Sequence, residues 1–289
     1  MINLSKNPIT NIDIIDKLIS NYKNNSLPNS LIFSGPKGIG KATSAFYFVN
    51  KILDLSSSSN NHNNLIYNNS HPNVKLLTLE IDEKSNKLKN FISIDQIRSL
   101  NNFLFQSSID NAPKFVIIDS TDDLNINSSN ALLKILEEPK LKTFLILISH
   151  QISNLLPTIR SRSIYFNFKS PTYDEFKEIL KNTNNEDKYD FEFLYKFSNH
   201  SPGLAIDMNS DKLTLLYSKI FEILEFSDNL LSEKLIELAE IVSKFSNNEF
   251  KLFIMMIKYT LILKIKNNLG IIDNDNNIFR DNNNSIYLN

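Results

Sequence analysis

The sequence GPKGIGK, at residues 35–41, holds three of the five glycines in this chain of 289 residues. A short apolar stretch, 31–34, precedes it, and residues 41–55 follow with apolar side chains at helical spacing. A strand, a glycine-rich loop and a helix in this order are typical of a phosphate-binding loop, where backbone N–H groups and a lysine hold phosphate oxygens. The alternative is a tight turn that binds nothing. The stretch predicts an α/β fold of the nucleotide-binding kind.

The residues expected to form the nucleotide site are Gly35, Gly38, Gly40, Lys41, Thr43 and Asp119. In such loops the residue after the lysine is usually Ser or Thr, whose hydroxyl binds the Mg²⁺ of a nucleoside triphosphate. This chain has Ala42 there, and its first hydroxyl comes one residue later, at Thr43. We therefore expect weakened Mg²⁺ binding.

A second departure follows Asp119, which ends an apolar run where a P-loop ATPase places the acid that holds Mg²⁺. ATPases of the AAA+ type continue with a glutamate that activates the attacking water, but this chain has Ser120. A hydroxyl cannot replace a carboxylate as the base at neutral pH. Asp122 and Asp123 lie further along, where turn formation or helix capping is the expected role. Ala42 and Ser120 thus each remove a part of the machinery for hydrolysis.

Composition excludes several classes of protein. The hydrophobic content of 42% indicates a globular chain, and the net charge of -1 gives no global attraction to nucleic acid or to an anionic membrane. The absence of cysteine excludes disulfides and thiolate zinc sites, and the four histidines show no metal-ligand spacing, so no metal site is predicted. No apolar signal core opens the chain, and the apolar stretch 252–265 carries two lysines. We expect a cytoplasmic protein without membrane contact.

Five apolar stretches read as strands, and helical patterns separate them. The stretches are 31–34, 74–81, 114–119, 143–149 and 164–168, with helices at 41–55, from Ser93 through Leu104, and at 128–138. Ser93 and Gln96 have the spacing of a capping box at the start of the second helix. Strands that alternate with helices predict a five-stranded parallel sheet covered on both faces. After Pro171 the pattern is helical only.

Three further segments make the likeness to one family specific. They are IDQIR at 94–98, NALLKILEEP at 130–139 and LPTIRSRS at 156–163, and together they resemble the AAA+ clamp-loader subunits of bacterial DNA polymerase III. The likeness covers residues 27–168 well and the rest in outline. It implies an AAA+ nucleotide-binding-like domain at 1–168, a helical lid at 169–210, and at 211–289 an all-α C-terminal collar domain that holds a ring of subunits and ends in a polar tail.

The resemblance also gives a role to Arg162. In the family, the arginine of a Ser-Arg-Cys motif reaches the ATP site of the neighbouring subunit, where a planar, permanently charged fork stabilises charge on the γ-phosphate. This chain has Ser161-Arg162-Ser163, so the resemblance implies that Arg162 is the arginine finger, with Ser163 in place of cysteine. A surface arginine or a salt bridge is the alternative. Arg160 is expected to be structural.

Two more departures bear on function. Many relatives carry a four-cysteine zinc module where this chain has a polar Ser/Asn-rich insert, 56–70, so no zinc is expected. The lid motif of the family ends in glycine followed by a nucleotide-sensing arginine, but here Leu204 follows Ser201-Pro202-Gly203. With Ala42 and Ser120, this indicates a stationary subunit without ATPase activity of its own. No resident cofactor is expected, and weak binding of ATP or ADP stays open.

The resemblance implies assembly with the gamma/tau ATPase subunits and the delta subunit of the clamp loader, and contact with the sliding clamp and primed DNA through the complex. Three alternatives stay open: an active motor subunit of the gamma/tau type, a delta subunit and a P-loop kinase. Ala42, Ser120 and Leu204 argue against the first of these. The phosphate loop and the arginine motif argue against the second, and the helical second half argues against the third.

Overall fold

The computed structural model describes residues 7–56, 65–66, 68–82, 87–108, 111–182, 191–208, 220, 231–245 and 247–269. The chain divides into two compact units, Met1–Leu204 and Ala205–Asn289, which are described separately. None of the described helices is long and apolar enough to cross a membrane. The three predicted domains, with boundaries at 168 and 210, stay a prediction.

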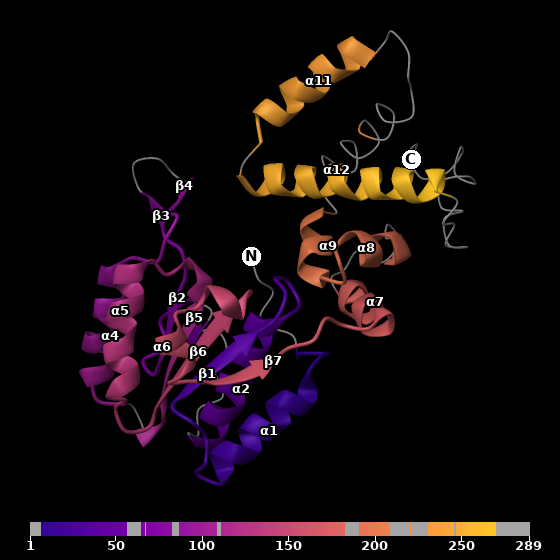
Figure 1. Ribbon diagram of the computed structural model, residues 1–289. Helices are drawn as coiled ribbons and strands as arrows, with labels where there is room; N and C mark the ends of the chain where they lie inside the picture. The colour runs from indigo at the N-terminus through magenta and orange to yellow at the C-terminus, as the bar shows by residue number, and fades with distance from the viewer. Residues whose placement is uncertain are drawn as a thin grey trace. The chain divides into compact units, whose positions relative to one another are not determined.

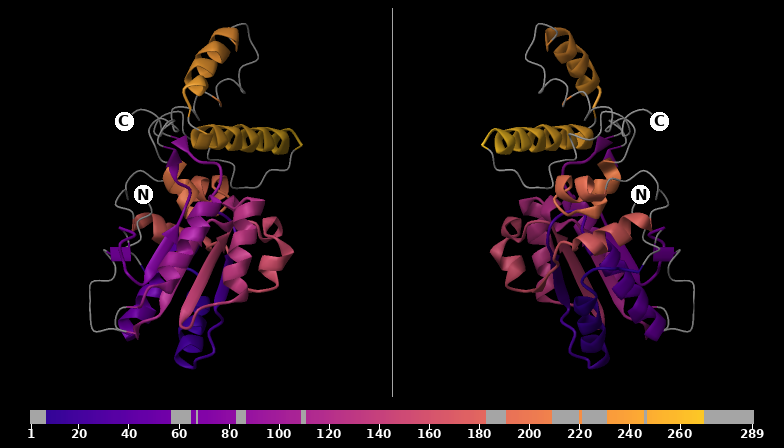
Figure 2. Two further views of the ribbon diagram at one scale, coloured as in Figure 1. Left: turned by 90° about the vertical axis from the view of Figure 1, so that its left-hand side faces the viewer. Right: turned by 90° about the vertical axis from the view of Figure 1, so that its right-hand side faces the viewer.

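The first unit is built on the predicted five-stranded parallel sheet (Figures 1 and 2). Its strands are β1 (Ser30–Ser34), β2 (Val74–Leu77), β5 (Lys114–Asp119), β6 (Thr143–Ser149) and β7 (Ile164–Asn167). They lie in the order β2-β5-β6-β1-β7, and all four neighbouring pairs are parallel. The three central strands are buried along nearly their whole length, because helices cover both faces of the sheet.

Successive side chains of each strand point to opposite faces, so the sheet separates two apolar cores. On one face, Phe33 and Phe115 pack with α1 (Ile12–Lys23) and α2 (Lys41–Ser56). On the other, Ile32 and Val116 pack with helices α4, α5 and α6. Those three helices are α4 (Ile94–Phe105), α5 (Ile126–Glu137) and α6 (Pro157–Arg160). Helices α1 and α6 were not expected from the sequence.

The prediction of a single strand at 74–81 was wrong. Strand β2 ends at Leu77, and β3 (Ile81–Asp82) pairs antiparallel with β4 (Lys87–Leu88) in a separate hairpin. The side-chain amide of Gln96 donates to the carbonyl of Thr78, the residue after β2, at 2.9 Å. A carbonyl bound to a side chain of α4 does not continue the ladder, so the chain leaves the sheet there.

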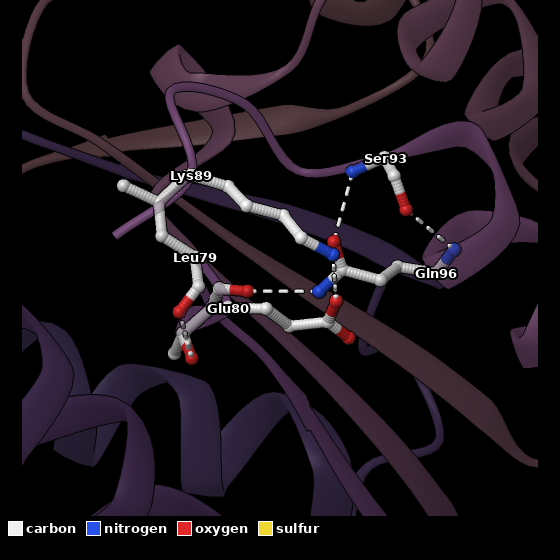
Figure 3. A network of polar contacts seen from close by, with 6 residues as sticks. Leu79, Glu80, Lys89, Ser93 and Gln96 are labelled. Carbon is white, nitrogen blue, oxygen red and sulfur yellow. Dashed lines mark hydrogen bonds and ion pairs between the residues drawn. The ribbon is translucent and has the colours of Figure 1, made fainter. Parts of the chain in front are cut away.

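The capping box predicted from Ser93 and Gln96 is confirmed. The Gln96 backbone N–H donates to the Ser93 hydroxyl at 3.2 Å, and the Gln96 side-chain oxygen accepts from the Ser93 N–H at 2.8 Å (Figure 3). Because Gln96 also binds Thr78, this one side chain both starts α4 and ends β2.

After β7 the described residues form helices and no strand, as the sequence predicts. The first unit continues with α7 (Tyr173–Lys181), α8 (Phe191–Phe197) and the start of α9 (Pro202–Met208), and the second unit holds α11 (Leu231–Ser243) and α12 (Asn247–Asn268). Most of the polar insert, at 57–64 and 67, and the tail from 270 lie outside the described residues. Within the insert, the described Ile66 is buried in the core beside α2.

Candidate functional site

The predicted phosphate loop lies between β1 and α2, at the carboxyl end of a central strand. This is the edge of a parallel sheet where α/β proteins bind their ligands. The loop backbone needs its glycines, because Gly38 and Gly40 have φ angles of 78° and 95°, which residues other than glycine rarely adopt. The strand–loop–helix order is therefore present, and phosphate binding by it stays a prediction.

Lys41 is the central charge of this edge, and its side chain is only 3% exposed. Its Nζ donates to the carbonyl oxygens of Gly35 and Pro36, each at 2.6 Å. Burial lowers the pKa of Lys41 to about 8, although the nearby carboxylate of Asp119 acts in the opposite direction. Two of the three N–H groups of the ammonium thus have acceptors within its own loop, and one remains for a phosphate oxygen.

The two positions after the lysine are Ala42 and Thr43, and only the second carries a hydroxyl. Ala42 packs its methyl group against the apolar core on the α1 and α2 side of the sheet. Thr43 is half-buried in the first turn of α2. Among the described residues, no group of three or more His, Cys, Asp or Glu side chains could hold a metal ion. The absence of a metal site stays a prediction.

A contact that the sequence did not indicate joins the loop to the start of α9. The Ser201 hydroxyl donates to the carbonyl of Lys37 at 2.8 Å, and the Gly203 N–H donates to the carbonyl of Gly38 at 2.9 Å. The Leu204 N–H donates to the Ser201 hydroxyl at 3.3 Å, which fixes that hydroxyl at the helix start. We call these contacts the α9 clasp. Sequence reasoning found the motif but assigned it no partner.

The clasp depends on two glycines that face each other. A Cβ on Gly203 would lie 2.9 Å from the Cα of Gly38, and a Cβ on Gly38 would lie 2.3 Å from the Ser201 hydroxyl oxygen. The residue after this glycine, Leu204, offers no charge to a phosphate. The lid motif therefore binds the loop through backbone and hydroxyl groups.

At the end of the neighbouring strand β5, Asp119 is largely enclosed, and burial raises the pKa of its carboxyl group, against the opposing charge of Lys41. The Ser120 hydroxyl donates to Asp123 at 2.7 Å, so the residue in the position of the catalytic glutamate is used to cap a short helical turn. The expected capping role of Asp123 is confirmed. No carboxylate stands at position 120 to activate a water.

Asp122 joins the ends of β5 and β6. It accepts hydrogen bonds from the Ser149 hydroxyl at 3.1 Å and from the N–H groups of His150 and Gln151 at 2.6 and 3.2 Å. The sequence predicted turn formation or helix capping for Asp122, but its carboxylate binds a distant segment instead, the end of β6. Its carboxylate has three donors from the chain itself, so it is not a free base.

His150 belongs to this edge and was missed. Burial and the nearby charge of Lys41 lower its pKa to about 4, so the ring is neutral at physiological pH. Its Nδ1 atom is buried and has no hydrogen-bond partner among the described residues. The available signal was its position directly after the fully apolar strand 143–149, at the same edge as Asp119. The structure thus brings together Lys41, Asp119, Asp122 and His150.

Arg162 makes its contacts elsewhere, on the segment between α6 and β7. Its Nη2 lies 2.9 Å from a carboxylate oxygen of Glu137, and its Nη1 donates to the carbonyl of Thr158 at 3.1 Å. The side chain is 36% exposed. In the isolated chain Arg162 therefore forms the salt bridge that the sequence left as an alternative. Its role toward a neighbouring subunit stays a prediction.

The Ser163 hydroxyl, in place of the family's cysteine, lies 2.7 Å from that of Ser30 and joins β7 to β1.

Comparison with known proteins agrees with the resemblance seen in the sequence. The family model described as "DNA polymerase III, delta subunit" matches residues 10–172, more than half of the chain. The chain belongs to this family. It is 35% identical over 142 residues to the DNA polymerase III subunit delta' of Pseudomonas aeruginosa, which covers 47% of this chain and 42% of that protein. To the subunit delta' of Bacillus subtilis it is 28% identical over 154 residues, 52% of this chain and 44% of that protein. The chain thus spans less than half the length of these two relatives.

Solved structures that align with the chain were also found. A DNA polymerase III gamma subunit-related protein from Thermotoga maritima aligns with a TM-score of 0.46 at 21% identity, over 85% of this chain and 78% of that one. The RuvB branch migration motor of Thermotoga maritima aligns with a TM-score of 0.46 at 16% identity, over 81% and 70%.

Proposed function

We propose that this chain acts as the stationary delta-prime subunit of a bacterial clamp loader. In this role it donates Arg162 to the ATP site of a neighbouring gamma/tau motor subunit and helps to place the sliding clamp on primed DNA during replication. Its partners would be the motor subunits and the delta subunit, with the clamp and DNA reached through the complex. The proposal carries a location with it, the cytoplasm, where the bacterial chromosome is copied.

The observation that carries the proposal is the exposed side chain of Arg162 within the region that the family model matches. An arginine finger must reach a phosphate on another subunit, so it has to lie at the surface on a rigid support. Arg162 follows α6, whose Ile159 is fully buried in the core shared with α5. The support is therefore part of the sheet domain.

The chain's own nucleotide site supports the stationary role. It lacks the Mg²⁺-binding hydroxyl at Ala42, the base at Ser120 and the sensing arginine at Leu204, while loop carbonyls take two of the three N–H groups of Lys41. We propose that the chain holds no resident cofactor, binds no zinc and hydrolyses no ATP by itself, and that any binding of ATP or ADP is weak. Turnover by the purified chain that disappears in Lys41→Ala would favour a motor subunit instead.

The decisive experiment reconstitutes the complex with motor and delta subunits and measures DNA- and clamp-stimulated ATP hydrolysis and clamp loading. An arginine finger is worth roughly 10³–10⁵ in rate at the site that it serves. Arg162→Ala should therefore silence one site, while sites served by other subunits continue, so the total rate falls only by that share. Arg162→Lys should lose nearly as much, because an ammonium cannot form the fork.

The neighbouring Arg160 supplies the matched control. Arg160, for which the sequence predicted a structural role, is exposed in the last turn of α6 and is in none of the ion pairs found among the described residues. Arg160→Ala removes the same charge from the same surface and should leave hydrolysis and loading unchanged. Normal clamp loading by the Arg162→Ala complex would contradict the proposed function.

A further inference from the structure

The guanidinium of Arg162 is already engaged by its own chain. Nη2 pairs with Glu137 at 2.9 Å, and Nη1 donates to the Thr158 carbonyl at 3.1 Å and to the Ser161 hydroxyl at 3.4 Å. We propose that Glu137 holds Arg162 in a parked position on the surface of this chain, and that Arg162 exchanges this carboxylate for a phosphate of the neighbouring subunit when the complex binds ATP. The inference rests on the proposed function and adds a regulating residue to it.

The geometry makes the carboxylate and a phosphate compete for the same face of the guanidinium. A guanidinium binds a phosphate most strongly through a pair of parallel N–H groups, which form a fork. In the structure both Nη nitrogens are directed at acceptors of the chain itself. Each Nη nitrogen carries two N–H groups, so a phosphate competes with Glu137 for the Nη2 N–H that the carboxylate holds, and a fork that uses this N–H forms only when the carboxylate is displaced.

Electrostatics also favours the exchange of the carboxylate for a phosphate. A carboxylate bound to Arg162 cancels the positive charge that a finger brings to the γ-phosphate, and beside a triphosphate it would be repelled. Glu137 is the last residue of α5, so its carboxylate also lies at the negative end of the helix dipole. Departure of Arg162 leaves this carboxylate facing solvent, where it is 49% exposed and can be hydrated.

The pair is weak enough to exchange. Both side chains are substantially exposed, and exposed ion pairs typically shift an equilibrium by only about 1.4- to 5-fold. A phosphate offers more charge and two oxygens in fork geometry, so it should displace the carboxylate readily. Glu137 would therefore tune the availability of Arg162 by a few-fold and would not block it.

The variant that tests this is Glu137→Gln, which keeps the size and an acceptor oxygen but removes the charge. The matched control is Glu138→Gln, which makes the same change one residue away, on an exposed side chain that is in none of the ion pairs found among the described residues. The quantity to compare is the Arg162-dependent rate, defined as the stimulated hydrolysis of the reconstituted complex minus that of the complex with Arg162→Ala.

At subsaturating ATP, Glu137→Gln should raise the Arg162-dependent rate, by up to about 5-fold. Glu138→Gln should leave it unchanged. In the double variant with Arg162→Ala, Glu137→Gln should have no effect, because the cycle isolates the coupling between the two residues. In the isolated chain, the ¹⁵N signals of the Arg162 guanidinium should change with Glu137→Gln and not with Glu138→Gln.

The outcomes separate the inference from the function. If Arg162→Ala lowers the rate but Glu137→Gln leaves the Arg162-dependent part unchanged, Glu137 does not restrain the finger. If Glu137→Gln lowers that part, the carboxylate positions the finger for reaction, and parking is wrong. If Arg162→Ala changes nothing, the proposed function fails and the inference fails with it.

Discussion

At the scale of single residues, the candidate nucleotide site combines an intact lysine with missing partners. Lys41 has the position of a phosphate-binding lysine, and the loop carbonyls of Gly35 and Pro36 take two of its three N–H groups. Ser120 replaces a base and caps a turn instead. The site has therefore kept the parts that shape the fold, while the parts that would serve hydrolysis have other uses or are absent.

The buried ammonium predicts a pH dependence of folding stability. Burial lowers the pKa of Lys41 to about 8 in the folded chain, against 10.5 for an ordinary lysine. Between these values the unfolded chain binds more protons than the folded one, so the free energy of unfolding rises with pH. Below pH 8 the full cost of the buried charge is present, of the order of 1–3 kcal/mol.

Urea unfolding between pH 7.5 and 10.5 tests this. Lys41→Met should remove the part of the rise in unfolding free energy that comes from Lys41. Lys51→Met, at an exposed lysine of the same helix, should leave the rise unchanged. Equal slopes in the two variants would show that Lys41 is not buried as a charge.

The α9 clasp predicts different costs for two glycines of the loop. Gly38→Ala and Gly40→Ala both place a side chain at positive φ, which costs about 1–2 kcal/mol. Only at Gly38 would the new methyl group meet Ser201, because nothing lies within 4 Å of a Cβ on Gly40. Gly38→Ala should therefore be the more destabilising variant by about 1 kcal/mol, the value of a lost hydrogen bond. Equal midpoints in urea would mean that the clasp contributes nothing.

At the scale of elements, Gln96 joins the start of α4 to the end of β2. Ser93→Ala removes one half of the capping box and should cost about 1 kcal/mol. Gln96→Ala removes the other half and also the bond to Thr78, so it should cost about 1 kcal/mol more. Chemical denaturation of the two variants gives both numbers. A Gln96→Ala variant no less stable than Ser93→Ala would show that the bond to Thr78 does not help to end β2.

Local sequence patterns were sufficient to predict most of the helices and strands of the first unit. The strands β1, β5 and β6, the helices α2 and α4, and the capping box all follow from apolar spacing or from two residues three apart. The end of β2 did not, because Thr78 is bound by Gln96, 18 residues later. The α9 clasp joins Lys37 to Ser201 across 164 residues, and Glu137 meets Arg162 across 25. Such pairs carry no local signature, so the site's partners could be found only in three dimensions.

At the scale of the whole molecule, the chain combines a unit with two packed cores and a helical unit whose role is still a prediction. The first unit, Met1–Leu204, holds the sheet and both cores, and it includes the loop, the clasp and Arg162. In the second unit, α12 exposes several large apolar side chains, among them Ile254, Leu261, Ile262 and Ile265. Exposed apolar groups of this kind are typical of surfaces that bind other proteins.

If the second unit is a collar, removing it should separate folding from assembly. A chain ending at Met208 keeps α9 and both cores of the first unit, so it should unfold cooperatively in urea. It should fail to join the motor subunits on a sizing column. In the full chain, Leu261→Ser with Ile262→Ser should weaken assembly and leave unfolding of the first unit unchanged, because both side chains are exposed on α12. The control Lys258→Ser changes an exposed residue of the same helix and should assemble normally. Full-affinity assembly by the shortened chain would place the binding surface in the first unit and would make the collar assignment wrong.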